Sequence, residues 1–528
     1  MACSLLNLQA ELQFLIFQHL QSYKNPEEPD VQTRNQSLRK HGIFERDLRN
    51  LSLTCSFYYA TLLPYTFKTL VLQNNETSAS SILRCMVSAT RNYIQFTRVL
   101  QFTDTRAMKL ALEDEYSANG RRKKDDENDI NITELCRLPT SAMEILSSLS
   151  CFPNLDHLVI HWRFHDSDWY IENYTIGGET EDDNGVAERE EQFPWRALMR
   201  DVYNAVSKNV VDINIAIPPS SSLSYSSSSS PPQAGPLQSP HMPPILKSLE
   251  IRNSPMNPVS SYLSPTFHNF LSTIHSFKLN LMTAQNIGHY AINTCFQYQD
   301  FTSKLDEYLF NHLSSATSLH IAARDGPLGS EDRGPAYCPL SLPPTQQLPV
   351  LKRLVLDTCF ITTPSTIDFL VRHARSLERV KFFRCFSSND GNTWCKLFQA
   401  LARAEPEWLV ELCVEPAKVK FREASWRRNE ENEREAARCE ALLRGGDGDE
   451  EEWEGECVAS EEGRGEAGRR GRRAFCYGYI DDKYGFVAEI PAMNRGMLLR
   501  GEDQWAYDAL MEIVECNRKR LMAAESGI

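Results

Sequence analysis

The sequence predicts an α/β protein in which a short N-terminal helical module is followed by an irregular solenoid of strands and helices. Two observations support this class. Apolar residues near the N-terminus recur at helical spacing, and a short strand-like pattern recurs further along at intervals that leave room for a helix. The chain has 528 residues. Because single cores stop growing at roughly 250 to 300 residues, we expect several domains or one extended repetitive structure.

Two separated blocks form the predicted helical module. In the first block the apolar residues lie on one face of a helix, at Leu8, Leu12, Leu15, Ile16 and Leu20. Asp47 can cap a second helix, because its carboxylate can accept hydrogen bonds from the amides of the first turn. The residues between them, 23–46, are polar and contain Pro26 and Pro29. They are typical of a surface loop.

These blocks resemble an F-box, the helical module that docks proteins onto the Skp adaptor of cullin-based ubiquitin ligases. The matching positions are Leu8, Glu11, Leu12, Ile16, Phe17, Leu20, Asp47, Leu48, Cys55 and Tyr58. Gln9 stands where the family has proline, and residues 63–70 resemble the tail of fungal members. The resemblance implies a module over residues 1–72, with a loop insert over 23–46. It also implies adaptor binding through Leu8, Leu12, Ile16, Phe17, Leu20, Leu48, Leu51 and Cys55. The alternative is an amphipathic helix that packs on its own domain.

After the helices, a strand pattern of leucine, two residues, aliphatic, one residue, aliphatic recurs. The better copies are 155–160, 246–251, 316–321, 351–356 and 377–382. Weaker copies are 67–72, 96–102, 210–215, 274–279 and 409–414. Between two copies, residues 366–374 carry apolar residues at helical steps. Each interval therefore accommodates a strand and a helix.

This pattern resembles a degenerate leucine-rich repeat array, which implies a solenoid over residues 73–420. The alternative is an ordinary α/β domain whose buried strands happen to show the same sequence pattern. Three inserts, about 113–131, 175–191 and 218–244, are acidic or rich in serine and proline, and we expect them to be disordered. Residues 421–474 are predicted to be a charged, disordered segment. Residues 475–528 are predicted to cap the solenoid, with a helix over 505–522.

Composition limits the classes of function. The net charge of -14 lies in the acidic inserts and the charged segment, which leaves the rest of the chain close to neutral. We therefore predict no nucleic-acid partner, because no basic face is evident. No stretch of about 18 apolar residues occurs, so no membrane partner is predicted. The 15 cysteines are an odd number and many lie in apolar runs. This usage favours reduced thiols in the cytoplasm or nucleus.

A search for catalytic chemistry finds no glycine-rich phosphate loop and no Gly-x-Ser-x-Gly motif. We predict no catalytic residue, no cofactor and no metal. The sharpest alternative is a metal site at His157, His161 and His165, whose spacing would align them on a helix. The neighbouring Leu155, Leu158 and Ile160 instead mark a strand, on which residues 157 and 161 point away from the core.

Strand alternation predicts an exposed surface. It assigns to one face His157, Val159, His161, Glu250, Arg252, Arg353, Val355, Asp357, Arg379, Lys381 and Phe383. Within this set we predict that Arg353, Arg379, Lys381 and Phe383 bind an acidic or phosphorylated segment of a client protein. The alternative is that these side chains only maintain solubility.

Together these features predict a non-catalytic substrate receptor of a Skp-cullin-F-box ubiquitin ligase. Its expected partners are a Skp-type adaptor with its cullin complex, and a client protein. One alternative is an F-box-like repeat scaffold that does not engage a ligase, to which Gln9 and the 23–46 insert point. A second is a hydrolase or metalloenzyme without a recognisable motif.

Overall fold

The computed structural model describes the chain in thirteen stretches. They are residues 56–87, 93–105, 137–163, 183–209, 246–282, 296–323, 328–330, 340–388, 391–415, 419–422, 429–444, 473–481 and 484–526. The eight predicted adaptor-binding residues, the 23–46, 113–131 and 218–244 inserts, and the strand candidate at 210–215 lie outside these stretches. The first described element is helix α3 (Ser56–Thr66), which begins at the end of the second F-box-like block and contains Tyr58.

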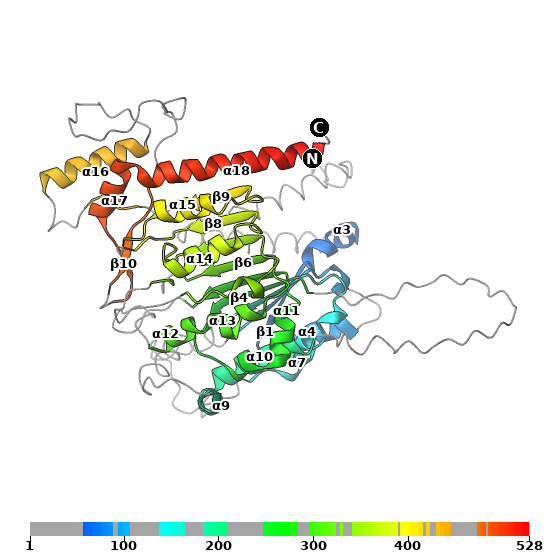
Figure 1. Cartoon of the computed structure of the whole chain (residues 1–528). Coiled ribbons are helices and arrows are strands. Elements are labelled where there is room, and N and C mark those ends of the chain that lie inside the picture. Colours follow the sequence, from blue (N-terminus) through cyan, green and yellow to red (C-terminus); the bar gives the residue numbers. More distant parts are fainter. Residues whose placement is uncertain are drawn as a thin grey trace, which may run out of the picture.

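The centre of the protein is a single nine-stranded sheet whose strands are all parallel and follow one another in sequence order. Figure 1 shows them stacked along the long axis of the molecule. The strands are β1 (Thr69–Gln73), β2 (Val99–Thr103), β3 (His157–His161), β4 (Ser248–Ser254), β5 (Ser276–Leu281), β6 (Ser318–Ala322), β7 (Arg353–Asp357), β8 (Arg379–Phe383) and β9 (Glu411–Glu415).

The strand predictions are confirmed wherever the structure describes the segment. All five better copies of the leucine pattern overlap a strand, and so do the weaker copies at 67–72, 96–102, 274–279 and 409–414. Their inward residues are buried, as Leu354 and Leu356 of β7 illustrate. Strands buried in this way on one face carry apolar residues at every second position. The predicted helix at 366–374 is also present, as α14 (Pro364–His373).

The predicted fold class, a leucine-rich-repeat-like solenoid, is wrong. The chain forms an α/β fold around one continuous parallel sheet, and the connections between its strands are not equivalent units. The β3–β4 connection contains α9 (Asp183–Gln192) and α10 (Pro194–Ser207), whereas the β4–β5 connection contains η5 (Ser260–Leu263) and α11 (Pro265–Ser272). The leucine pattern indicates that a strand is buried on one face of a sheet. It does not indicate a repeating unit, because a strand covered by helices on one face produces the same pattern.

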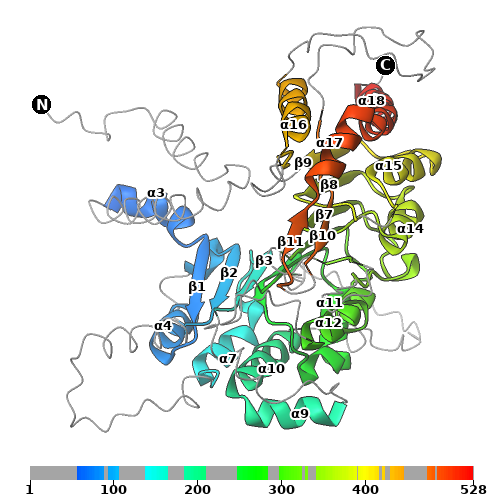
Figure 2. The same ribbon diagram turned by 90° about the vertical axis from the view of Figure 1, so that its left-hand side faces the viewer.

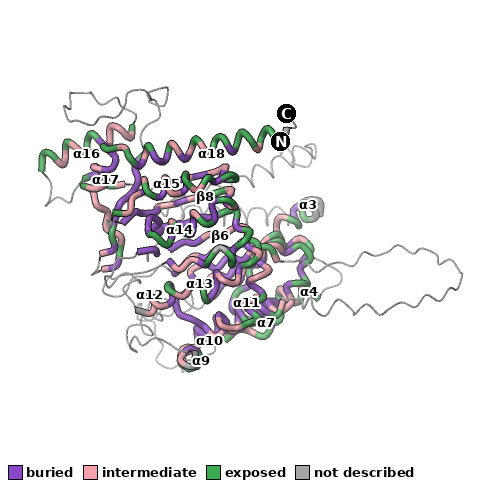
Figure 3. The backbone as a smooth tube through the Cα atoms, in the orientation of Figure 1, coloured by how far each residue is buried: buried purple, intermediate pink, exposed green. Residues whose placement is uncertain are grey.

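Helices cover one face of the sheet. Figure 2 shows α4 (Glu76–Val87), α7 (Thr140–Leu146), α10, α11, α14 and α15 (Trp394–Arg403) on the same side. The other connections contain η2 (Tyr93–Phe96), η3 (Leu149–Cys151), α12 (Phe296–Ser303), α13 (Leu305–Tyr308), η7 (Phe310–His312) and η8 (Thr345–Gln347). One cluster of buried apolar residues runs through this layer from Leu72 to Val514. In Figure 3 the strands and the inner sides of the helices are accordingly buried.

The chain turns sharply at the ends of three strands. Asn253, Thr358 and Arg384 have φ angles of 49°, 59° and 48°. They occupy equivalent places: Asn253 is the residue before the last in β4, and Thr358 and Arg384 directly follow β7 and β8. Such left-handed conformations are uncommon for residues other than glycine. The backbone is held there by hydrogen bonds between neighbouring turns, from the Thr358 amide to the Phe383 carbonyl and from the Arg384 amide to the Glu415 carbonyl.

The C-terminal part completes the end of the sheet. It contains α16 (Glu430–Leu443), a small sheet of β10 (Gly478–Ile480) and β11 (Val487–Glu489), α17 (Pro491–Arg500) and α18 (Glu502–Ser526). The predicted helix at 505–522 is therefore present within α18. This helix packs along α15 and β9, as Figure 1 shows. The side chains of Leu510 and Val514 are buried, whereas those of Trp505 and Met522 are exposed.

Two segments that were predicted to be disordered contain helices. Helix α9 covers Asp183–Gln192, within and just beyond the 175–191 insert, and α16 lies within 421–474. Acidic composition alone suggested that neither could bury enough apolar surface. In the structure, Val186 and Glu190 of α9 are buried, and so are Ala436 and Cys439 of α16. Tertiary contacts thus order both segments.

Candidate functional site

The candidate site lies on the face of the sheet opposite the helix layer, which we call the polar face. It is formed by the side chains that alternate with the core residues of each strand. The register aligns them into rows across the sheet. The central row from β2 to β9 is Gln101, Val159, Glu250, Lys278, His320, Val355, Lys381 and Cys413. Because the strand order never reverses, the sheet lacks the switch point at which open α/β sheets usually bind ligands. The polar face is therefore a better candidate for a binding site than the carboxyl edge of the strands.

The first group of charges on the polar face surrounds Glu250 of β4, and we call it the Glu250 cluster. Arg252 forms two hydrogen bonds with the carboxylate, from Nε to Oε1 at 2.8 Å and from Nη2 to Oε2 at 2.9 Å. Lys278 of β5 places Nζ 3.4 Å from Oε1, and His157 of β3 places Nε2 3.5 Å from Oε2. The Glu250 side chain is only 8% exposed.

This arrangement controls the charge of Glu250. Burial favours its neutral form, but the hydrogen bonds from His157 and Arg252 and the positive charges of Lys278 and Arg252 outweigh that effect. They hold the pKa of Glu250 well below its usual range. The carboxylate therefore stays ionised at any ordinary pH. Two permanent cations face this single carboxylate, so the Glu250 cluster has an excess of positive charge.

The second group contains the predicted client-binding cations, and we call it the Glu411 cluster. Arg353 of β7 and Arg379 of β8 are direct register partners, and Arg379 is in turn the partner of Glu411 in β9. Lys381 places Nζ 2.6 Å from Oε1 of Glu411, and Arg379 places Nε 3.8 Å from Oε2. The structure thus brings the three predicted cations together. It also adds a carboxylate that the sequence analysis did not include.

The cations of the Glu411 cluster differ in how strongly they are engaged. The Lys381 side chain is 23% exposed and that of Arg379 is 55% exposed. Arg353 is exposed and forms no ion pair with the residues that the structure describes. The hydrogen bond from Lys381, opposed by partial burial and aided by the charges of Lys381, Arg379 and Arg353, lowers the pKa of Glu411. With three cations around one carboxylate, this cluster also has an excess of positive charge.

Phe383, the fourth predicted client-binding residue, ends β8 on the same face. Its register partners are Asp357 of β7 and Glu415 of β9. It is half-buried, so it can offer an apolar surface beside the cations. The structure therefore places all four predicted residues on one side of two adjacent strands.

Several residues predicted to be exposed on this face are in fact buried. They are Val159, Glu250, Val355 and Asp357, each at most 6% exposed. The two valines are short and lie between longer neighbours, with Gln101 and Glu250 beside Val159, and His320 and Lys381 beside Val355. The two carboxylates are covered by the cations that bind them. Alternation correctly predicts the face but not the depth of each side chain.

Lys278 and Glu411 are the charged residues that the sequence analysis missed. Both lie in strands that the weaker copies of the pattern predicted, at 274–279 and 409–414. The signal that could have found them is their alternation with core residues, Phe277 and Leu279 around Lys278, and Leu412 after Glu411. Their pairing with residues of neighbouring strands depends on the order of the strands, which local sequence does not specify.

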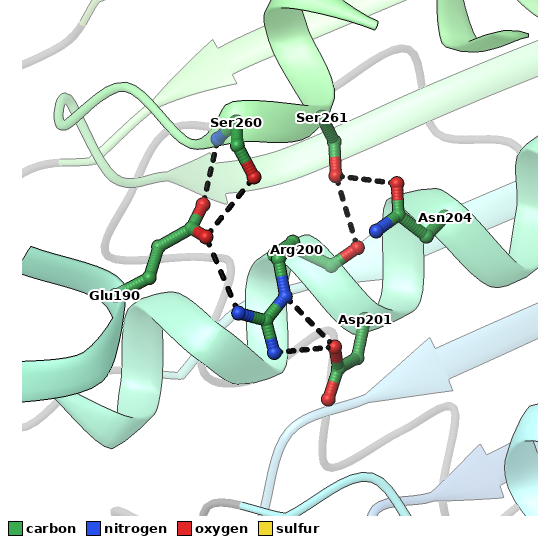
Figure 4. Close-up of polar contacts among 6 residues, drawn as sticks. All are labelled: Glu190, Arg200, Asp201, Asn204, Ser260 and Ser261. Carbon is green, nitrogen blue, oxygen red and sulfur yellow. Dashed lines mark hydrogen bonds and ion pairs between the residues drawn. The ribbon is translucent and has the colours of Figure 1, made fainter. Parts of the chain in front are cut away.

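A second polar site lies in the helix layer. The buried Glu190 of α9 accepts hydrogen bonds from the Ser260 amide at 2.6 Å and the Ser260 hydroxyl at 3.0 Å, and Arg200 of α10 approaches it at 3.3 Å. Arg200 also binds Asp201, and the Ser261 hydroxyl donates to Asn204. Figure 4 shows how these contacts tie α9, α10 and η5 together. The donors and acceptors satisfy one another, which indicates a structural network.

A cleft of about 480 Å³ lies beside this network, between α7, α10 and the start of α11. It is lined by Met143, Asp201, Asn204, Ala205, Lys208, Ser264 and Thr266. Asp201 is already paired with Arg200 at 2.9 Å. The lining is mixed in character, and in the described part of the chain no hydrogen bond joins its Ser264 or Thr266 hydroxyl to Asp201 or Lys208, so it does not indicate a reaction.

The metal alternative at His157, His161 and His165 depends on a helix, and residues 157–161 form strand β3 instead. His165 lies outside the described residues. Among the described residues no group of three or more His, Cys, Asp or Glu side chains is placed to hold a metal ion. Within the same part of the chain, no helix is long and apolar enough to cross a membrane.

Comparison with known protein families and with curated proteins finds no match to this sequence. The geometry of the polar face is therefore the main evidence for a function.

Proposed function

We propose that the chain is the substrate-receptor subunit of a Skp-cullin-F-box ubiquitin ligase. In this proposal the N-terminal segment binds a Skp-type adaptor, through Leu8, Leu12, Ile16, Phe17, Leu20, Leu48, Leu51 and Cys55. The polar face of the sheet binds an acidic or phosphorylated segment of a client protein. The chain itself carries out no chemistry. Tethering raises the effective concentration of the client at the conjugating enzyme that the cullin recruits.

The observation that carries the client-binding half of the proposal is the register of β7 and β8. It sets Arg353 directly beside Arg379, with Lys381 two residues further along the same strand and on the same face. Two adjacent guanidinium groups offer several donors to an incoming carboxylate or phosphate. Because Arg353 and Arg379 remain largely exposed, a ligand can reach them without unfolding any element.

The polar face suits recognition better than catalysis. Glu250 and Glu411 are both held ionised by neighbouring cations, so neither is poised to donate or accept a proton near neutral pH. The face is broad and lies across several strands, whereas enzyme sites are usually concave and enclosed. A protein segment that lies across the strands fits this surface.

The adaptor-binding half is tested by co-purification. The full-length chain, expressed with a Skp-type adaptor, is expected to retain the adaptor on an affinity resin. A Leu12→Asp/Ile16→Asp variant should lose it, because two charges would lie on the apolar face of the predicted helix. Substituting Gln13 and Gln18 by Asp places the same charges on polar positions of the segment and serves as the control. Retention by all three proteins would show that this face does not bind the adaptor, and retention by none would favour the scaffold without a ligase.

The client-binding half is tested by charge reversal. An Arg353→Glu/Arg379→Glu/Lys381→Glu variant should lose most of the capture of an acidic client segment, because each substitution removes a cation and adds a repelling carboxylate. The matched control replaces three exposed cations of the helix layer by glutamate, at Arg372, Lys396 and Arg403. Urea unfolding of both variants checks that they remain folded. Equal capture by the two variants would contradict the proposed client surface.

A further inference from the structure

The polar face carries two positively charged clusters, and their separation constrains the ligand. The register connects them directly, because Lys278 of the Glu250 cluster and Lys381 of the Glu411 cluster lie in the same row across the sheet. The residues between them in this row are His320 of β6 and Val355 of β7. Three strand-to-strand steps therefore separate the two lysines.

We propose that the two clusters bind one extended segment of a partner protein that carries two acidic side chains about four residues apart. This inference rests on the proposed client site and specifies what the client must contain. Neighbouring strands lie about 4.8 Å apart, so three steps span about 14 Å. An extended chain advances about 3.4 Å per residue, and side chains at even separations point to the same side. Positions i and i+4 of the segment therefore face the two clusters together.

Charge on the face supports two separate subsites. Among the described residues, each cluster holds more cations than carboxylates, with Arg252 and Lys278 against Glu250, and with three cations against Glu411. Between them, the outward residues of β6 are Ser318, His320 and Ala322, none of which is a carboxylate. On β7 the carboxylate of Asp357 is already held by Arg384. An acidic segment that crosses from one cluster to the other therefore passes no unpaired carboxylate among the described residues.

The same spacing argues against nucleic acid as the ligand. A nucleic acid strand carries a phosphate about every 3.4 Å of helix axis, so several phosphates would lie over β6, between the two clusters. The described outward residues of β6 offer them no lysine or arginine. Isolated acidic side chains, separated by residues without charge, match the two clusters better.

The test measures how affinity depends on the spacing between two acids. The full-length chain is titrated with fluorescein-labelled peptides of glycine and serine that carry one glutamate, or two glutamates separated by two, four or eight positions. Fluorescence anisotropy at low ionic strength reports the binding. The peptide with glutamates at i and i+4 should bind about tenfold more tightly than the peptide with one glutamate, because a second charge-assisted contact forms. Equal affinity for all three spacings would overturn the inference.

A neutral variant identifies the second subsite. Glu250→Gln/Arg252→Gln/Lys278→Gln removes the excess charge and leaves no buried carboxylate without a partner. It should reduce the affinity for the i, i+4 peptide to that of the single-glutamate peptide, and lower the single-glutamate affinity by no more than about twofold, because the Glu411 cluster still binds one acid. If the triple variant does not fold, Lys278→Gln provides the same comparison, because Arg252 still pairs with Glu250. The matched control is Asp368→Asn/Arg372→Gln/Lys396→Gln on the helix layer.

The outcomes separate this inference from the proposed function. If adding Arg353→Glu/Arg379→Glu/Lys381→Glu to the neutral Glu250-cluster variant leaves the single-glutamate peptide bound equally well, the proposed client site itself is wrong. If that variant loses the single-glutamate peptide, but the neutral Glu250-cluster variant binds the i, i+4 peptide as tightly as the unaltered chain, only the two-site inference is wrong.

Discussion

The guanidinium group of Arg384 binds both oxygens of the buried carboxylate of Asp357. Its Nη2 lies 2.6 Å from each carboxylate oxygen, and its Nε lies 3.1 Å from Oδ1. Asp357 ends strand β7, and its side chain is only 2% exposed. Arg384 follows β8 and has a left-handed backbone conformation, with φ of 48°. This ion pair therefore fixes the turns of two neighbouring strands at one edge of the polar face.

Replacing Arg384 by glutamine should destabilise the protein by about 2 to 3 kcal/mol, because a buried carboxylate would lose its charged partner. Glutamine has the same backbone preference as arginine at this φ, so the change isolates the ion pair. The double variant Asp357→Asn/Arg384→Gln should recover part of the loss, since it leaves no unpaired charge. Urea unfolding of the single and double variants measures both effects. Strict additivity of the two substitutions would contradict a direct interaction.

The sequence predicted the strands of this fold better than their assembly. Residues 351–356 and 377–382 were predicted to be buried strands because the inward Leu354, Leu356 and Phe382 occupy alternate positions of the leucine pattern, and alternation is a local property. The same alternation suggested repeat units, which is wrong, because it contains no information on what covers the strand. The pairing of Lys278 with Glu250 joins residues 28 positions apart through the order of strands. No local pattern specifies such an order.

Buried charge was the feature least accessible from sequence. Glu190 lies in an acidic run that suggested disorder, yet its carboxylate is buried because Ser260, 70 residues later, donates two hydrogen bonds to it. Glu250 was predicted to be an exposed residue, and its burial depends on side chains from three strands, His157 of β3, Arg252 of β4 and Lys278 of β5. In both cases partners on other elements take part. The burial of a charged side chain therefore follows from tertiary structure rather than from the residue type or its neighbours in sequence.

His373 should make the protein less stable in acid. It is 1% exposed in α14, its ring lies tilted against that of Phe369 with centroids 4.5 Å apart, and its ring nitrogens have no hydrogen-bond partner in the described part of the chain. Burial, and secondarily the charge of Arg372, lowers its pKa to about 4. The unfolded chain, with an ordinary pKa near 6.5, binds this proton more readily. Stability is therefore lost as the pH falls from about 6.5 towards 4.

The measurement is the pH dependence of urea unfolding for His373→Leu. This variant should lack the part of the acid destabilisation that comes from protonating His373. His275→Leu, the same substitution at an exposed histidine, is the control and should leave the slope as it is in the unaltered chain. Identical slopes for the two variants would show that His373 is not the group that titrates.

Asp503 should affect the pH dependence of stability in the opposite direction to His373, in nearly the same pH range. Its carboxylate accepts hydrogen bonds from the Tyr477 hydroxyl and from the Cys395 amide, both at 2.8 Å. Burial nevertheless raises its pKa to about 6, because desolvation disfavours the charged form. The folded state thus binds this proton more tightly than the unfolded state. The stability that it contributes is present below about pH 4 and is lost as the pH rises through about 6.

Asp503→Asn removes this titration while its amide can still bond to Tyr477 and Cys395. Relative to the unaltered chain, the variant should gain stability as the pH rises from 4 to 7, on the order of 2 kcal/mol. The exposed Asp508 of the same helix provides the control, as Asp508→Asn. Thermal unfolding at several pH values measures the difference. A difference between the Asp503→Asn variant and the unaltered chain that does not change with pH would contradict the raised pKa.

Asn517 should determine how firmly α18 closes the end of the sheet. Its buried side-chain amide donates to the Pro406 carbonyl at 2.5 Å and to the Leu409 carbonyl at 3.2 Å, in the segment that leads into β9. Replacing Asn517 by leucine leaves these two carbonyls without their donor and should lower the free energy of unfolding by about 1 to 3 kcal/mol.

The exposed Lys519, two residues further along α18, gives the control Lys519→Leu. Hydrogen exchange of the β9 amides should become faster in the Asn517 variant and stay unchanged in the control. Because α18 packs on β9 and α15, at one end of the sheet, exchange in β3 and β4 should not change. Equal acceleration throughout the sheet would mean that the substitution lowers global stability instead of loosening this end.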